Sequence, residues 1–220
     1  MADAKSEHRA FLNKYYGISR HFYDLTRKYY LFGRDAALKE LLAQDWGSLI
    51  EVGVGTGRNL RLLHEARPQA SYGGVDASDE MLKHVGARAP WAKLQHGFAE
   101  DVDMTRVLDG SRPDRILFSY CLSMVNDPLA ALRNAQRALA PGGKVFVVDF
   151  SDLGGFPGVF RGALRVWLRT FHVQPVDLAV LQELGADIRF GRGHYYVMAE
   201  LDADAVETQP SPELLRLRHE

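Results

Sequence analysis

The ten residues from Ser48 to Gly57, SLIEVGVGTG, decide which fold this sequence predicts. An apolar run that ends in three alternating glycines, Gly53, Gly55 and Gly57, indicates a strand followed by a tight turn. Glycine has no Cβ, so the backbone there can turn sharply and approach a ligand closely. Residues 58–66 follow with the apolar spacing of an amphipathic helix, whose N-terminus would lie at the same turn.

A second part of the same predicted site follows along the chain. Asp76 closes the next apolar run, residues 71–77, and a carboxylate at that place can accept hydrogen bonds from two ribose hydroxyls. The dinucleotide fingerprint G-x-G-x-x-G requires a third glycine where this chain has Arg58. The loop and Asp76 together predict a nucleoside-containing ligand, and they leave both a nicotinamide dinucleotide and another adenosine-type cofactor open.

Short apolar runs and amphipathic segments alternate through the rest of the chain. Further strands are expected over 91–99, 114–122 and 144–150, and helices over 78–85 (with Ser78 as N-cap), 128–140 and 159–171. The 114–122 run is the longest, which favours a central strand buried on both faces. Residues 187–190 and 194–201, joined through a Gly-Arg-Gly turn, predict a closing hairpin. The pattern indicates an α/β fold: a mostly parallel sheet with helices on both faces and an antiparallel C-terminal hairpin.

Composition limits the possible classes of protein. With 220 residues, 46% hydrophobic, the chain is long enough for one soluble domain with a sizeable core. Its single cysteine, Cys121, excludes a disulfide framework, and its eight histidines have no metal-ligand spacing, so no metal is expected. A net charge of −1 gives no field to recruit nucleic acid. The longest uncharged stretch, residues 116–126, is too short to span a bilayer, and no secretory signal is visible, so a cytoplasmic location is expected.

Three regions are expected along the chain. Residues 1–47 form an N-terminal helical arm that is locally basic, with six basic residues and one acid between Arg9 and Arg34, and is rich in aromatic residues. Residues 48–201 form the α/β core. Residues 202–220 form an acidic tail that is expected to be loosely ordered.

Three segments together resemble class I S-adenosylmethionine-dependent methyltransferases. They are the E-V-G-V-G-T-G loop (51–57), the V-D-x-S-x-x-M-L segment (75–82) and the P-G-G-K turn (141–144). The resemblance covers residues 48 to about 200 and implies a Rossmann-like seven-stranded sheet, S-adenosylmethionine as cofactor, S-adenosylhomocysteine as product and no metal. It implies that the glycine loop lies against the amino-acid and ribose parts of the cofactor, and that the acid after the second strand holds the ribose. The cofactor-binding residues carried over by position are Glu51, Gly53, Gly55, Gly57, Asp76, Ala77, Met81, Ala99, Glu100 and Ser119.

One position departs from the family pattern. Many relatives have an acid that bonds the adenine amino group where this chain has Phe98. Either adenine is held more by stacking, or Glu100 or Asp101 supplies the missing hydrogen bond.

The predicted helix 159–171 bears on the methyl acceptor. Arg161, Arg165 and Arg169 recur every four residues and so share one face, while apolar side chains that include Trp167 cover much of the remainder. This arrangement suits a lipid headgroup interface, but a solvated helix on an ordinary core also explains it and, taken by itself, is the favoured interpretation.

A narrower resemblance concerns the acceptor. The segment FYDLTRKYYLFGRD (22–35) is similar to the start of the bacterial betaine-lipid N-methyltransferases, which methylate diacylglyceryl-homoserine, and LFSYCLSMV (117–125) and residues 147–175 look similar as well. It implies a lipid substrate met at the inner face of the membrane by a peripherally associated enzyme. The alternatives are a phosphatidylethanolamine N-methyltransferase, a small-molecule or quinone-type methyltransferase, a nicotinamide dehydrogenase and a non-catalytic nucleoside-binding protein. The oligomeric state stays open.

In the lipid-amine interpretation the acceptor amine must be neutral and aligned with the methyl group. Tyr23, Tyr30 and Tyr120 are the candidates for positioning it, and Arg34 is assigned to a carboxylate of the cofactor or of the lipid homoserine. Asp149 and His194 are the candidate proton acceptors.

Overall fold

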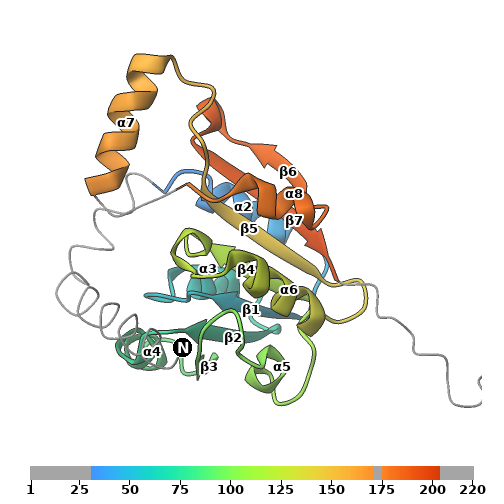
Figure 1. The fold of residues 1–220 in the computed structure, drawn as a ribbon. Helices are drawn as coiled ribbons and strands as arrows, with labels where there is room; N and C mark the ends of the chain where they lie inside the picture. Colours follow the sequence, from blue (N-terminus) through green and yellow to red (C-terminus); the bar gives the residue numbers. More distant parts are fainter. Residues whose placement is uncertain (1–30, 171–174, 204–220) are drawn as a thin grey trace, which may run out of the picture.

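The computed structural model of the chain describes residues 31–170 and 175–203. Most of the N-terminal arm, including Tyr23 and Tyr30, and the tail after residue 203 lie outside this range. One seven-stranded sheet has the order β3-β2-β1-β4-β5-β7-β6 (Figure 1). Its strands are β1 (Ser48–Val52), β2 (Ser71–Asp76), β3 (Lys93–His96), β4 (Arg115–Ser119), β5 (Lys144–Phe150), β6 (Asp187–Phe190) and β7 (Tyr196–Asp202).

The first five strands are parallel, and β7 runs antiparallel to both of its neighbours, β5 and β6. The expected fold, a mostly parallel Rossmann-like sheet closed by a C-terminal hairpin, is therefore confirmed. The strand order reverses between β1 and β4, so their carboxyl ends open a crevice of the kind in which ligands bind in α/β sheets.

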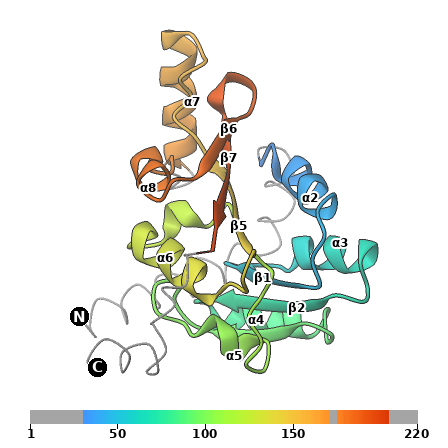
Figure 2. The ribbon, with the colours of Figure 1, turned by 90° about the vertical axis from the view of Figure 1, so that its right-hand side faces the viewer.

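Helices cover both faces of the sheet (Figures 1 and 2). They are α2 (Arg34–Leu42), α3 (Arg58–Ala66), α4 (Asp79–Gly86), α5 (Met104–Val107), α6 (Pro128–Ala138), α7 (Gly158–Thr170) and α8 (Leu178–Glu183), with two 3₁₀ turns, η1 (Leu122–Met124) and η2 (Arg192–His194). The short helices α5 and α8 have no counterpart among the elements expected from the sequence.

Alternation along β4 explains the two apolar layers. Ile116 and Phe118 point to the layer that contains α5, α6 and α8, whereas Leu117 points to the layer of α2, α3 and α4. All three side chains are essentially inaccessible to solvent. The prediction of a central strand buried on both faces is thus confirmed.

The helix and strand limits follow local signals. Ser78 precedes α4, and its Oγ accepts a hydrogen bond from the backbone N–H of Met81 at 3.4 Å, as the N-cap prediction required. The apolar run 114–122 is longer than β4, because Tyr120 adopts a left-handed backbone (φ 55°) that ends the strand.

α2 packs Leu38 and Leu41 against the sheet, so this end of the arm shares the core of residues 48–201.

Candidate active site

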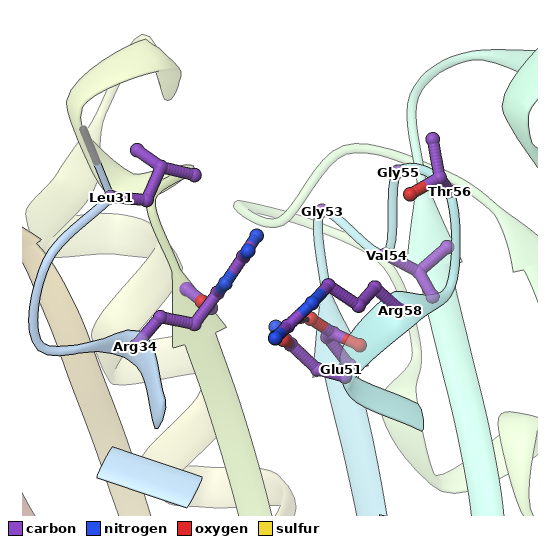
Figure 3. Close-up of a pocket in the computed structure, with 10 residues that line it drawn as sticks. Leu31, Arg34, Glu51, Gly53, Val54, Gly55, Thr56 and Arg58 are labelled. Carbon is purple, nitrogen blue, oxygen red and sulfur yellow. Dashed lines mark hydrogen bonds between the residues drawn. The ribbon is translucent and has the colours of Figure 1, made fainter. Parts of the chain in front are cut away.

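A cavity opens at the carboxyl ends of β1 and β4, where the strand order reverses (Figure 3). Its empty volume, with the open mouth included, is about 410 Å³. Five of the predicted cofactor-binding residues line it: Arg34, Glu51, Gly53, Gly55 and Ser119. Sequence reasoning missed the other five, which are Leu31, Val54, Thr56, Arg58 and Asn59. The signal for most of them was present, because they alternate with the glycines or begin the helix that follows.

The glycine loop has the backbone that glycine makes possible. Gly53, Gly55 and Gly57 all have positive φ angles, of 67°, 53° and 74°. A Cβ at Gly53 would lie 2.5 Å from the Cβ of Cys121, so this position also has no room for a side chain. A Cβ at Gly55, by contrast, would have only the Gly53 carbonyl oxygen nearby, at 3.8 Å, so the loop leaves space above this residue.

Glu51 is the most perturbed carboxyl group of the cavity. Only 2% of the residue is exposed, and its Oε1 accepts a hydrogen bond from Asn59 Nδ2 at 2.7 Å. Burial raises the pKa of Glu51 from 4.5 to about 8, although Asn59 and the positive charge of Arg34 act in the opposite direction. Figure 3 shows the Arg34 side chain reaching from the start of α2 into the space beside the glycine loop.

Two buried polar atoms of the cavity fit the predicted cofactor. Glu51 Oε2 and Ser119 Oγ have no hydrogen-bond partner among the described residues. A buried acceptor without a partner costs roughly 1–3 kcal/mol, which a bound ligand with N–H or O–H groups would recover. The amino-acid part of S-adenosylmethionine carries an ammonium group that suits Glu51, and Arg34 suits its carboxylate. The residues present therefore fit this cofactor.

Asp76 ties the glycine loop to the end of β2. Its Oδ2 accepts a hydrogen bond from Gly55 N and its Oδ1 from Ser78 N, both at 2.9 Å. Burial raises the pKa of Asp76, and these backbone donors lower it. The neighbouring Ala77 places its carbonyl oxygen 3.0 Å from His96 Nε2, and Met81 is buried on α4. Asp76 thus contacts the loop directly, whereas neither it nor Ala77 nor Met81 lines the cavity, and their roles toward ribose and adenine stay predictions.

The loop after β3 is tied to neighbouring elements. Ala99 accepts a hydrogen bond from Asn134 Nδ2 of α6 at 3.0 Å. Glu100 Oε1 accepts from the backbone N–H of Asn126 at 3.2 Å and of Asp127 at 3.4 Å, which joins this loop to the start of α6. The predicted adenine contacts of Ala99 and Glu100 are not tested by this geometry.

The structure gives Tyr120 a specific contact. Its hydroxyl donates a hydrogen bond to the carbonyl oxygen of Phe32, and its ring packs edge-on against Phe150 with centroids 4.7 Å apart. Burial raises the pKa of Tyr120 above its usual value, so this hydroxyl keeps its proton. Through this bond Tyr120 holds the segment that carries Leu31 and Arg34 at the cavity.

The two candidate proton acceptors lie in different surroundings. Asp149 is fully buried and accepts hydrogen bonds from Ser123 N at 3.1 Å and Phe150 N at 2.8 Å. Burial raises the pKa of Asp149 to about 6. His194 is partly exposed on η2, with Nδ1 3.5 Å from Asp152 Oδ1. Neither lines the cavity of Figure 3, and their roles as proton acceptors stay predictions.

Two kinds of feature are absent from residues 31–170 and 175–203. No group of three or more His, Cys, Asp or Glu side chains in these ranges could hold a metal ion. No helix in the same ranges is long and apolar enough to cross a membrane.

Comparison with known proteins identifies the family. Residues 23–201 match the family model described as a methyltransferase domain. The chain is 30% identical over 174 residues to the demethylmenaquinone methyltransferase of Tropheryma whipplei (strain Twist), covering 74% of this chain and 67% of that protein. It is 27% identical over 199 residues to the demethylmenaquinone methyltransferase of Thermus thermophilus, covering 88% and 84%.

A solved structure agrees on the fold. The TehB-like S-adenosylmethionine-dependent methyltransferase from Corynebacterium glutamicum matches with a TM-score of 0.57 at 16% identity, over 84% of this chain and 97% of that one. The chain therefore belongs to the methyltransferase domain family, as a class I S-adenosylmethionine-dependent methyltransferase. Both named relatives are quinone methyltransferases by name, so the narrower resemblance to betaine-lipid enzymes stays a proposal.

Proposed function

We propose that this methyltransferase transfers methyl groups to the amine of a diacylglycerol lipid headgroup, with diacylglyceryl-homoserine as the first candidate. The observation that carries the proposal is the sequence of residues 22–35, which resembles the start of enzymes that act on a diacylglycerol lipid and which contributes Leu31 and Arg34 to the cavity. The similarity of residues 22–35 to the betaine-lipid N-methyltransferases supports an amine as the accepting group.

The side chains at the cavity have separable tasks in this proposal. Glu51 and Ser119 hold the amino group of the cofactor, and Arg34 holds a carboxylate. S-adenosylmethionine supplies a methyl group on a positively charged sulfur. The chain must place a neutral amine in line with that methyl group, and orientation supplies much of the acceleration. Tyr23 and Tyr30, which lie outside the described residues, stay the candidates for holding the amine.

The amine must lose a proton before it reacts. An alkylamine with a pKa near that of lysine, about 10.4, is almost fully protonated at neutral pH, and an apolar, water-poor site lowers that pKa. Tyr120 is an unsuitable acceptor for this proton, since its hydroxyl is bonded to Phe32 and keeps its own proton. Asp149, with a pKa of about 6, is a better candidate base, but it does not line the cavity. It can accept the proton only if a local rearrangement brings its carboxylate to the cavity.

A second candidate function is methyl transfer to a ring carbon of a quinone precursor. The observation that favours it is the similarity to demethylmenaquinone methyltransferases over most of the chain. Both candidates use the same cofactor cavity, so the acceptor has to be determined by the product.

The test is methyl transfer from labelled S-adenosylmethionine to vesicles that contain one acceptor each. The acceptors are diacylglyceryl-homoserine, phosphatidylethanolamine and demethylmenaquinone, and the products are separated by class. Label in the homoserine lipid supports the proposal. Label only in phosphatidylethanolamine keeps an amine acceptor and changes the headgroup, whereas label only in the quinone establishes the second candidate. No label in any of them, with S-adenosylhomocysteine still bound, overturns both.

Two glycine variants form a matched control for this assay. Gly55 and Gly142 both have positive φ angles, and a Cβ at either meets no side chain, but only Gly55 lines the cavity. Gly55→Leu is expected to abolish labelling of every acceptor, while Gly142→Leu carries the same kind of backbone strain and keeps the activity.

A further inference from the structure

The exposed apolar side chains of the described residues gather at one end of the molecule. Four large ones are exposed: Val159 (88%), Val166 (63%), Phe32 (56%) and Phe190 (42%). The Phe190 ring stacks on His194 with centroids 4.2 Å apart, and the Phe32 ring packs edge-on against the adjacent Tyr195 at 5.3 Å. Phe32 and Phe190 are thus linked through two consecutive residues of the β6–β7 connection.

α7 extends this surface. Phe156, just before α7, packs so closely on Gly193 that a Cβ there would lie 2.5 Å from its ring, which brings the helix to the same connection. Leu164 anchors α7 on the apolar cluster that contains Tyr120, Phe150 and Tyr195. Figures 1 and 2 both show α7 standing out from the body at the end where β5 and β6 finish.

The outward face of α7 is formed by small and apolar residues. Val159, Gly162, Ala163 and Val166 are all exposed, and their spacing of three and four residues places them on one side of the helix. The two exposed valines are removed from water only when another apolar surface covers this face of the helix.

The charge of the α7 segment favours one kind of covering surface. The sequence from 153 to 176 contains three arginines and no acid, and it is flanked by Asp152 and Asp177, in a chain whose net charge is −1. Arg192 adds an exposed positive charge on η2, and the nearby Asp152 carboxylate accepts a hydrogen bond from Gly154 N. Exposed apolar side chains on a segment whose charged residues are all basic match the interface of an anionic lipid bilayer, in which valine and phenylalanine enter the acyl boundary and basic residues meet headgroups.

One end of this surface, at Phe32, lies next to the cofactor cavity. Phe32 is adjacent to Leu31, which lines the cavity, and Tyr120 bonds the Phe32 carbonyl. We infer that Phe32, the outward face of α7 and Phe190 form a docking face for an anionic membrane, oriented so that a lipid headgroup reaches the cavity without leaving the bilayer. This inference rests on the proposed lipid acceptor and adds the surface and the orientation.

The test is co-sedimentation of the full chain with vesicles. Binding is expected to vesicles of phosphatidylcholine with phosphatidylglycerol, to be much weaker to phosphatidylcholine alone, and to fall as salt is raised. The double variant Val159→Asp/Val166→Asp is expected to bind the anionic vesicles at least about tenfold more weakly. The matched control is Gln69→Asp/Ala87→Asp, which adds the same charge at exposed positions near the opposite edge of the sheet and should bind as the unchanged chain does.

The remaining readouts separate this inference from the proposed function. A short-chain homoserine lipid, dispersed below its micelle concentration, should be methylated equally by the unchanged chain and the α7 variant, while only the unchanged chain is fast on vesicles. Vesicle binding that depends on α7, without methylation of any lipid amine, keeps the docking face and overturns the proposed function. Equal vesicle binding by the two double variants overturns the docking face. The docking face is also overturned if light scattering shows that the unchanged chain is a dimer and that the α7 double variant is a monomer.

Discussion

The substitution Glu51→Gln tests the electrostatics of the cavity most directly. Glutamine keeps the shape of the side chain and an oxygen to accept the hydrogen bond from Asn59, but it cannot ionise. The folded chain raises the pKa of Glu51 from 4.5 to about 8, so it holds the proton more tightly than the unfolded chain does. At neutral pH most folded molecules without ligand therefore carry a neutral Glu51.

The sign of the stability effect follows from this shift. Because the folded-state pKa is raised, the contribution of Glu51 is most favourable below pH 4.5, and stability is lost as the pH rises toward 8. The loss is about 1.4 kcal/mol per pH unit, or roughly 5 kcal/mol over the whole interval. A glutamine at this position does not titrate, so the variant should gain stability relative to the unchanged chain by about 1.4 kcal/mol per unit between pH 5 and pH 8.

Urea unfolding of both proteins at several pH values measures this difference. Taking the difference also removes the parallel effect of Asp149, whose pKa is raised to about 6 in both. A difference in unfolding free energy that stays constant between pH 5 and pH 8 would refute the assignment of a buried, mostly neutral Glu51.

Ligand binding gives the second readout of the same substitution. An ammonium group beside Glu51 favours the ionised carboxylate, so binding of S-adenosylhomocysteine at pH 7 should release close to one proton and strengthen as the pH rises toward 8. Calorimetry in two buffers of different ionisation enthalpy counts that proton. The Glu51→Gln variant should bind more weakly and should lose the proton release from this carboxyl group; unchanged proton release would contradict the predicted contact.

Three further substitutions probe other parts of the structure. Tyr120→Phe keeps the ring and removes the hydrogen bond to the Phe32 carbonyl; it should cost about 0.5–1.5 kcal/mol of binding free energy for S-adenosylhomocysteine, measured by calorimetry. Gly53→Ala should destabilise the fold by roughly 2–5 kcal/mol in thermal unfolding, because φ is 67° and the new Cβ meets Cys121. Arg67→Ala removes hydrogen bonds to three main-chain carbonyls of the α2–β1 connection; a loss of about 2–4 kcal/mol in urea unfolding, with ligand affinity unchanged, is expected.

The alternation of apolar runs and glycine turns was sufficient to predict the sheet, because its central strands β1, β2, β4 and β5 are short and mostly buried. β5, Lys144–Phe150, coincides with its predicted range, since Gly143 precedes it and the apolar pattern stops with it. The 91–99 run was too long by five residues because only Lys93–His96 finds pairing partners on β2. Apolar character alone does not report where a neighbouring strand ends.

The candidate site was predictable where the backbone itself forms it. The glycine loop and Glu51 occupy the cavity because a parallel strand must end there. Contacts between residues that are far apart in the sequence were harder to predict. The bond from Tyr120 to Phe32 joins residues 88 positions apart, and the exposure of Val159 on α7 depends on how that helix stands off the sheet. Neither is encoded in local spacing.

The position of β7 has a consequence for synthesis of the chain. β7, Tyr196–Asp202, pairs with β5 over seven residues and separates it from β6, although it is made after both. A chain that leaves the ribosome without these residues has β5, KVFVVDF, as an open and strongly apolar edge strand, and β6 without its partner. Such an edge recruits other chains, so premature termination should yield aggregates rather than a smaller, working enzyme.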